Sequence, residues 1–249
     1  MSIVTVNKMK DAPQDESGRA ARQKIVIAVD GPAASGKGTL ARMVADRLGY
    51  AYLDTGALYR AVALAALELG GDPSKFEEVA PALEIIKRNL TPELLANPAL
   101  RGHGVSEAAS KVAALPEVRM GLVDYQREFA KNPPGDVGGA VLDGRDIGTV
   151  IYPAADLKFF VTATLEERAR RRFNELKAGA RNMTLQKVLQ DIQQRDQRDS
   201  SRKMAPTATA RDAHILDTTR LNPAEALAAA ITIISSKFLS ESDEIPPGG

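Results

Sequence analysis

The strongest chemical signal in the sequence is a glycine-rich run that ends in a lysine and a hydroxyl residue. The run consists of Gly31, Pro32, Ala33, Ala34, Ser35, Gly36, Lys37, Gly38 and Thr39. An apolar stretch, 25–29, precedes it and an amphipathic stretch follows it, which is the order of strand, loop and helix that a phosphate-binding loop requires. Backbone N–H groups and a helix N-terminus attract phosphate oxygens, and Lys37 adds a full positive charge. The alternative is a glycine-rich turn that binds nothing, and the lysine with its flanking elements argues against it.

Two further segments each place an arginine directly after a predicted strand. Arg60 ends the segment Asp-Thr-Gly-Ala-Leu-Tyr-Arg at 54–60, and Arg145 lies in Asp-Gly-Arg-Asp-Ile-Gly-Thr at 143–149. Arginine is suited to bidentate contacts with phosphate. A lone arginine in a loop more often forms a surface salt bridge, but two such loops beside a phosphate-binding loop favour a substrate role.

A third group of charged residues comprises Arg195, Arg198, Asp199 and Arg202. Offsets of three, four and seven residues place them on one helical face. The plain alternative is a solvated face with a weak Arg195–Asp199 pair. Three arginines against one carboxylate leave excess positive charge, which in a phosphate-handling enzyme predicts an anionic ligand.

Another basic cluster follows the fourth predicted strand and contains Arg168, Arg170, Arg171 and Arg172. The chain has no tryptophan and only Phe173 lies nearby, so a nucleic-acid patch is disfavoured against an adenine-side or lid helix. His103 and His214 lack the spacing of metal ligands. We find no general base, and a phosphate monoester acceptor needs none because its second pKa is about 6.

The composition bounds the class of protein. The 249 residues are 44% apolar and 26% charged, with 33 Lys and Arg against 32 Asp and Glu, a net charge of +1. No broad positive field is available for nucleic acid, so we expect no nucleic-acid partner. The absence of cysteine excludes disulfides and thiolate chemistry. Neither a membrane span nor a secretory signal is recognisable, and we expect a cytoplasmic protein without a membrane partner.

Short apolar strands alternate with helical patterns and must position these residues. The predicted strands are 24–30, 51–54, 139–143, 157–163 and 213–217. Thr164 with Glu167 predicts a capping box, and Asn222 with Pro223 predicts the start of the last helix. The alternation predicts an α/β fold with a parallel sheet whose carboxyl edge binds the ligand.

The domain organisation follows from the same pattern. We expect a flexible arm at 1–23, a single domain at 24–239 and a disordered tail at 240–249. Segment 72–122 has helical patterns but no convincing strand, and we interpret it as a mobile insert over the acceptor site. Segment 172–202 is the expected lid.

The chain resembles bacterial-type cytidylate kinases between about residues 24 and 238. The motifs that carry the resemblance are DTGALYR at 54–60, AASKVAALPEVR at 108–119, LDGRDIGTVIYP at 142–153 and RDQRDSSRKMAP at 195–206. The GKGT form of the phosphate-binding loop is typical of nucleoside monophosphate kinases. The resemblance implies a P-loop kinase core with a five-stranded parallel sheet, and phosphoryl transfer from ATP to CMP or dCMP. The segment between Gly71 and Ser110 looks shorter than the family's usual insert, and the N-terminal arm lies outside the pattern.

The resemblance also implies roles for individual residues. The loop 31–39 with Lys37 would hold ATP, with Arg171 on the adenine side. Thr39 would lie near Mg²⁺, and Asp143 would orient its water shell. Acceptor phosphate would meet Arg60, Arg145 and Arg202, with Thr55 nearby. The cytosine would meet Ser110, Arg119 and Asp146, and the sugar would meet Asp199. Arg195 and Arg198 would contact transferring phosphate.

Cytosine recognition by these residue types is chemically reasonable. Cytosine presents an amino donor at N4, which a carboxylate such as Asp146 can accept, whereas uracil presents an acceptor there. Alternatives remain: a P-loop kinase for AMP, UMP or shikimate, or a nucleotide-binding regulator without turnover. The retained Lys37, Arg60, Arg145 and Arg202 argue against the regulator. By analogy with small closing kinases, we expect a monomer.

Overall fold

The structure is a computed structural model that describes residues 24–102, 104–176, 184–202 and 204–240. The predicted arm at 1–23, nearly all of the predicted tail, His103 and residues 177–183 of the predicted lid lie outside these ranges.

Five parallel strands form one sheet in the order β2-β3-β1-β4-β5. The strands are β1 Ile25–Asp30, β2 Ala51–Asp54, β3 Gly139–Asp143, β4 Leu157–Thr162 and β5 His214–Asp217. The predicted α/β class and parallel sheet are confirmed, with strand ends that differ from prediction only at Lys24, Ala163 and Ala213. Every residue of β1 is buried, as its near-continuous apolar sequence requires for a central strand covered on both faces.

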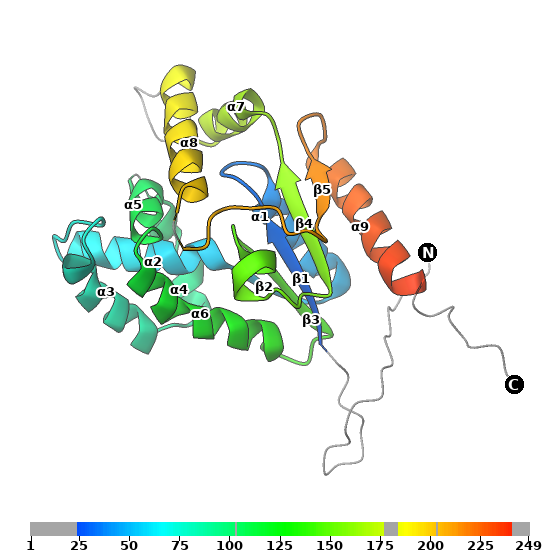
Figure 1. Cartoon of the computed structure of the whole chain (residues 1–249), viewed down its shortest axis with the longest axis horizontal. Helices are drawn as coiled ribbons and strands as arrows, with labels where there is room; N and C mark the ends of the chain where they lie inside the picture. The colour runs from blue at the N-terminus through cyan, green and yellow to red at the C-terminus, as the bar shows by residue number, and fades with distance from the viewer. Residues whose placement is uncertain (1–23, 103, 177–183, 203, 241–249) are drawn as a thin grey trace, which may run out of the picture.

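Helices cover both faces of this sheet (Figure 1). Alternate side chains of β1 divide between the faces: Ile27 packs with α1 Lys37–Leu48 and α9 Pro223–Ser240, whereas Ala28 packs toward α6 Pro116–Lys131. The chain enters α1 directly from the phosphate-binding loop. The sheet therefore fixes that loop at the carboxyl end of its central strand.

The two predicted helix starts behave differently. At α9, the Asn222 side chain accepts hydrogen bonds from the Ala224 and Glu225 N–H groups, and the Glu225 carboxylate accepts one from the Asn222 N–H. At α7 Leu165–Leu176, only half of the predicted capping box forms, since the Thr164 hydroxyl accepts from Glu167 N–H at 3.4 Å without a return bond. The Thr164 N–H instead donates to Thr219, and Arg170 and Arg171 occupy the Glu167 carboxylate.

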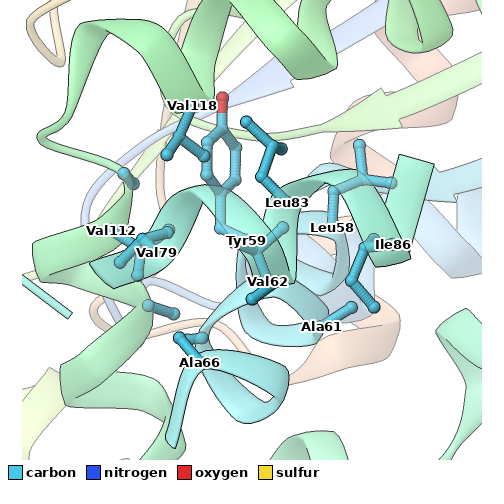
Figure 2. Packing of buried hydrophobic residues seen from close by; sticks show 14 of the residues in the cluster. Leu58, Tyr59, Ala61, Val62, Ala66, Val79, Leu83, Ile86, Val112 and Val118 are labelled. Carbon is cyan, nitrogen blue, oxygen red and sulfur yellow. The ribbon is translucent and has the colours of Figure 1, made fainter. Parts of the chain in front are cut away.

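The described part of segment 72–122 is helical and contains no strand. It holds α3 Phe76–Arg88, α4 Pro92–Ala96, the 3₁₀ turn η1 Pro98–Arg101, α5 Val105–Val112 and the first turns of α6. These helices pack on α2 Thr55–Glu68 around a separate apolar core. Figure 2 shows Leu58 and Val62 of α2 among Val79, Leu83 and Val118 from the surrounding helices. This second core fixes α5 and α6 beside the carboxyl edge of the sheet.

The last element at that edge is the helix pair α7 and α8 Leu185–Ser200, which stands beyond the ends of β1 and β4 (Figure 1). Helix α8 packs against both α7 and α5, so it bridges the phosphate-binding side and the inserted helices. No helix among the described residues is long and apolar enough to cross a membrane.

Candidate active site

A cavity of about 680 Å³ lies at the carboxyl edge of the sheet. Its walls come from the phosphate-binding loop, the first turn of α2, helix α5, the loop after β3, and the facing sides of α7 and α8. It gathers most of the predicted site residues into one place. Those lining it are Ala33, Ala34, Lys37, Thr55, Arg60, Ser110, Arg119, Asp143, Arg145, Asp146, Arg195, Arg198, Asp199 and Arg202.

The phosphate-binding loop has the backbone that its glycines permit. Gly31 has φ +152°, and a Cβ there would lie 2.1 Å from the Val161 carbonyl oxygen, so only glycine fits. Gly36 has φ +86° and leads into α1. Ala34 also adopts a left-handed conformation, with φ +59°, which is strained for a residue with a side chain. The rest of the structure must therefore hold Ala34 in place.

Lys37 extends from α1 to the end of β3, where its Nζ lies 3.2 Å from Asp143 Oδ1. Burial and the nearby Arg145 lower the pKa of Lys37, while Asp143 opposes the shift. The Asp143 carboxylate also lies over the first turn of α1, since a Cβ on Gly38 would meet its Oδ2 at 2.8 Å. Thr55 donates a hydrogen bond to the Asp143 carbonyl oxygen at 2.7 Å. This arrangement places a carboxylate and an ammonium beside the predicted phosphate site.

Thr39 does not share that position. It is exposed in the first turn of α1 and is not among the residues that line the cavity. The buried hydroxyl of this loop belongs instead to Ser35, whose Oγ has no hydrogen-bond partner among the described residues.

Asp199 is the centre of an arginine cluster that includes Arg195 and Arg202 of the predicted helical face and adds Arg145, whereas Arg198 donates to the Gln194 carbonyl. Arg145 Nε lies 3.0 Å from Oδ2 of Asp199, Arg202 binds Oδ1 of Asp199, and Arg195 Nε lies 3.9 Å away. Ser110 of α5 donates to the same carboxylate at 3.3 Å. Burial opposes ionisation of Asp199, but Arg145, Arg202 and Arg195 outweigh it and lower the pKa of Asp199. One carboxylate therefore organises three guanidinium groups that would otherwise repel one another.

Burial and the neighbouring cations both act on Arg195. Burial, and after it repulsion from Arg145, lowers the pKa of Arg195 to about 10. In the described part of the chain, the buried Nε atoms of Arg60, Arg195 and Arg202 have no hydrogen-bond partner. These arginines are ion-paired, but a buried N–H without a hydrogen-bond acceptor is costly, and an anionic ligand in the cavity would supply the acceptor.

Arg60 approaches from the other wall of the cavity. Its Nη2 binds Asp54 Oδ2 at 2.7 Å, and the same carboxylate caps α2 by accepting from Ala57 N–H at 3.2 Å. Since Asp54 is the last residue of β2, the strand end fixes the first turn of α2 and the direction of Arg60.

Arg119 and Asp146 form a buried pair at 2.5 Å, and each residue is only 5% exposed. The Arg119 guanidinium also lies over the ring of Tyr59, 5.5 Å from its centroid. Tyr59 also lines the cavity and was not among the predicted site residues. Its position in the 54–60 motif, one residue before Arg60, was the available signal.

The arginines at 168–172 do not form one surface patch. Arg168 is buried and Arg170 is exposed, whereas Arg172 lines the cavity. Arg171 does not line the cavity: it donates to the Thr218 carbonyl at 2.6 Å and to the Ser35 carbonyl at 3.4 Å. It therefore braces the phosphate-binding loop from outside.

The parallel sheet, the phosphate-binding loop and the convergent arginines define a P-loop nucleotide kinase. In its overall fold the chain matches an uncharacterized protein from Eubacterium ventriosum, with a TM-score of 0.51 and 11% identity over 86% of this chain and 99% of that one. The family model for cytidylate kinase matches residues 27–236. The cytidylate kinase of Rhodospirillum rubrum is 51% identical over 213 residues, 86% of this chain and 98% of that protein. That of Paramagnetospirillum magneticum is 51% identical over 212 residues, 85% and 98% of the two chains.

The chain belongs to the cytidylate kinase family. The predicted family is confirmed, and with it the class of enzyme, a phosphotransferase acting on nucleotides with ATP as phosphate donor.

Proposed function

We propose that this chain transfers the γ-phosphoryl group of ATP to CMP or dCMP, giving ADP and CDP or dCDP. The observation that carries the proposal is a set of buried Nε atoms, on Arg60, Arg195 and Arg202, that have no hydrogen-bond partner among the described residues and lie on residues lining the same cavity as Lys37. Two polyanions that repel each other must be held in line for such a transfer, and positioned cationic groups supply most of the catalysis.

In this proposal opposite walls of the cavity hold the phosphates of ATP and the phosphate of the acceptor. The loop 31–39 and Lys37 hold the ATP phosphates, with Arg171 bracing the loop. Arg60, Arg145 and Arg202 grip the acceptor phosphate, which Thr55 helps to orient, while Arg195 and Arg198 approach the transferring group. The acceptor oxygen is already largely ionised at neutral pH, so no side chain has to remove a proton.

We infer that the buried Arg119–Asp146 pair and Ser110 read the cytosine edge. The Asp146 carboxylate can accept from the N4 amino group, and Arg119 can donate to N3 or O2. Asp199, held by Arg145 and Arg202, accepts from a sugar hydroxyl. Uracil would set its O4 acceptor against the carboxylate, at a cost of about 1–3 kcal/mol.

The residues present fit a magnesium ion that accompanies ATP. Asp143 Oδ1 is buried and, among the described residues, has no hydrogen-bond partner, although Lys37 lies 3.2 Å away as an ion-pair partner. We propose that Asp143 orients the water shell of Mg²⁺, which would neutralise charge on the transferring phosphate. Thr39 does not line the cavity. In this proposal its hydroxyl therefore lies near the metal only when a nucleotide is bound.

We further propose that the kinase unit spans 24–239 and acts as a cytoplasmic monomer. The insert at 72–122 and the lid at 172–202 close on their substrates, since both supply residues to the cavity walls: Ser110 and Arg119 from the insert, and Arg195 and Arg198 from the lid. Closure excludes water, which protects ATP from hydrolysis.

The test is product analysis after incubation of the enzyme with ATP, Mg²⁺ and CMP. The proposal predicts equal amounts of ADP and CDP, resolved by ³¹P NMR, and no free phosphate. ADP that appears with inorganic phosphate instead of CDP would show an ATPase and refute the proposal. Binding of ATP without any product would favour the nucleotide-binding regulator.

A further inference from the structure

The two alanines of the phosphate-binding loop are held by residues of α7 and α8. The Ala33 N–H donates to Asp196 Oδ1 at 3.3 Å, and the Ala33 carbonyl accepts from Arg168 Nη1 at 3.2 Å. The helix pair α7 and α8 therefore binds both the N–H and the carbonyl of Ala33.

Arg168 and Asp196 also bind each other, so the contact forms a closed unit. Arg168 Nη1 donates to Asp196 Oδ2, and Arg168 Nε donates at 3.0 Å to the carbonyl of Ala163, which directly follows β4. Arg168 is 7% exposed and Ala33 4%. Asp196 uses both carboxylate oxygens as acceptors, one for the loop and one for Arg168.

An apolar contact reinforces this unit at the next residue. Ala34 packs against the small core between α7 and α8 that contains Ala169, Val188 and Ile192. Ala34 is the loop residue with the strained φ of +59°. Such a conformation persists only where the surroundings impose it, and here the helix pair does so.

Asp196 of α8 does not line the large cavity, although its neighbours Arg195 and Asp199 on α8 do. Arg168 of α7 does not line the cavity either. Helix α8 therefore presents one face to the substrates and binds the phosphate loop through another. A displacement of α8 that moved Arg195 and Asp199 would also move Asp196, which binds the Ala33 N–H and Arg168 of α7.

We propose that Asp196 and Arg168 form a latch through which α8 holds the phosphate-binding loop in its binding conformation. Both are positioning residues. Through them, the conformation of the ATP phosphate site is coupled to the position of the arginines on α8 that bind the acceptor. The inference rests on the proposed function for its meaning, but the loop–helix coupling can be measured by ATP binding alone.

The experiment compares Asp196→Asn with the wild-type enzyme by calorimetric titration with a non-hydrolysable ATP analogue and Mg²⁺, without CMP. Asparagine has the same shape, but it loses the negative charge and replaces one acceptor oxygen by an N–H₂ group, so it can keep only one of the two bonds, to Ala33 or to Arg168. The latch predicts an affinity loss of about tenfold, since hydrogen bonds involving charged groups contribute this much. Steady-state kinetics on the same variant should show KM for ATP rising more than kcat falls.

The matched control is Glu84→Gln, which removes an exposed ion pair with Lys87 on α3, remote from the cavity lining. It should bind the analogue as the wild type does. If Asp196→Asn does not fold, Arg168→Lys carries the test, because lysine keeps the charge but cannot reach three acceptors; we expect a several-fold loss.

An analogue affinity within twofold of wild type in a folded latch variant would overturn the proposal, even if thermal stability falls. The measurement is separate from turnover. A wild-type enzyme that binds the analogue but phosphorylates no nucleoside monophosphate would refute the proposed function and leave the latch to be judged by its own result.

Discussion

Asp30 offers the sharpest quantitative prediction, because it joins the two halves of the site. It is the last residue of β1, directly before the phosphate-binding loop, and is only 4% exposed. Its carboxylate oxygens accept hydrogen bonds from the N–H groups of Ile147 and Gly148, each at 2.8 Å. Those two residues follow Arg145 and Asp146. Asp30 therefore anchors the loop that we assign to the acceptor.

The pKa of Asp30 is raised from 3.8 to about 7. Burial is the main cause, and repulsion from Asp146 and Asp143 adds to it, while the two backbone hydrogen bonds oppose the shift. Between these two pKa values the folded protein holds a proton that the unfolded chain has lost. Stability must therefore fall as pH rises from about 4 to 7, and the contribution of this group must level off above 7.

The magnitude follows from the size of the shift. Each pKa unit corresponds to about 1.4 kcal/mol, so the full shift costs about 4 kcal/mol once Asp30 is ionised. Over the practical range from pH 5 to pH 8, the expected change is about 2–3 kcal/mol. Asp30→Asn does not titrate, and the contributions of the groups that do not interact with Asp30 cancel in the difference between the two proteins.

The assay is urea unfolding of the wild type and Asp30→Asn at a series of pH values from 5 to 8. The variant loses one acceptor, which gives it a constant penalty of about 1–3 kcal/mol. Apart from that constant penalty, the unfolding free energy of the variant relative to that of the wild type should increase by about 2–3 kcal/mol as pH rises from 5 to 8. Parallel curves for the two proteins would refute the reasoning, because they would show an Asp30 pKa that folding leaves unchanged.

Three other substitutions test the site directly. Asp146→Asn should narrow the preference for CMP over UMP by about 5- to 150-fold, since the amide can donate to uracil O4. Because kcat/KM ratios do not depend on the folded fraction, an unchanged ratio removes Asp146 from base reading. Arg145→Ala should lower kcat about 100- to 1,000-fold, and thermal melts should show little change because Arg202 and Arg195 remain beside Asp199; near-normal kcat would contradict the clamp. Lys37→Met should abolish turnover while CMP still binds by calorimetry, and loss of CMP binding would place Lys37 on the acceptor.

The strands could be predicted because local sequence determines them almost completely. Near-continuous apolar runs end at Asp30, Asp54 and Asp143, where the chain leaves the sheet. The phosphate-binding loop needed only glycines, a lysine and its place between a strand and a helix. The spacing of Arg195, Asp199 and Arg202 placed them on one face, and the structure brings these three together in the cavity.

Other features depend on contacts between distant segments, which spacing does not reveal. Arg168 and Arg172 have different roles because the packing of α7 directs them to different neighbours. Arg168 binds the Ala33 carbonyl, and Arg172 lines the cavity. Asp196 was not among the predicted site residues, because its partner Ala33 lies 163 residues away in the chain. Tertiary packing decides such assignments.

The most direct test of the account is the rate of ADP formation from ATP and Mg²⁺ with CMP, dCMP, UMP and AMP offered in parallel. We expect rapid turnover on CMP and dCMP, with kcat/KM for UMP and AMP lower by tenfold or more. Preference for UMP or AMP would contradict the assignment of Ser110, Arg119 and Asp146 to the cytosine edge, and no turnover on any of the four would contradict phosphoryl transfer itself.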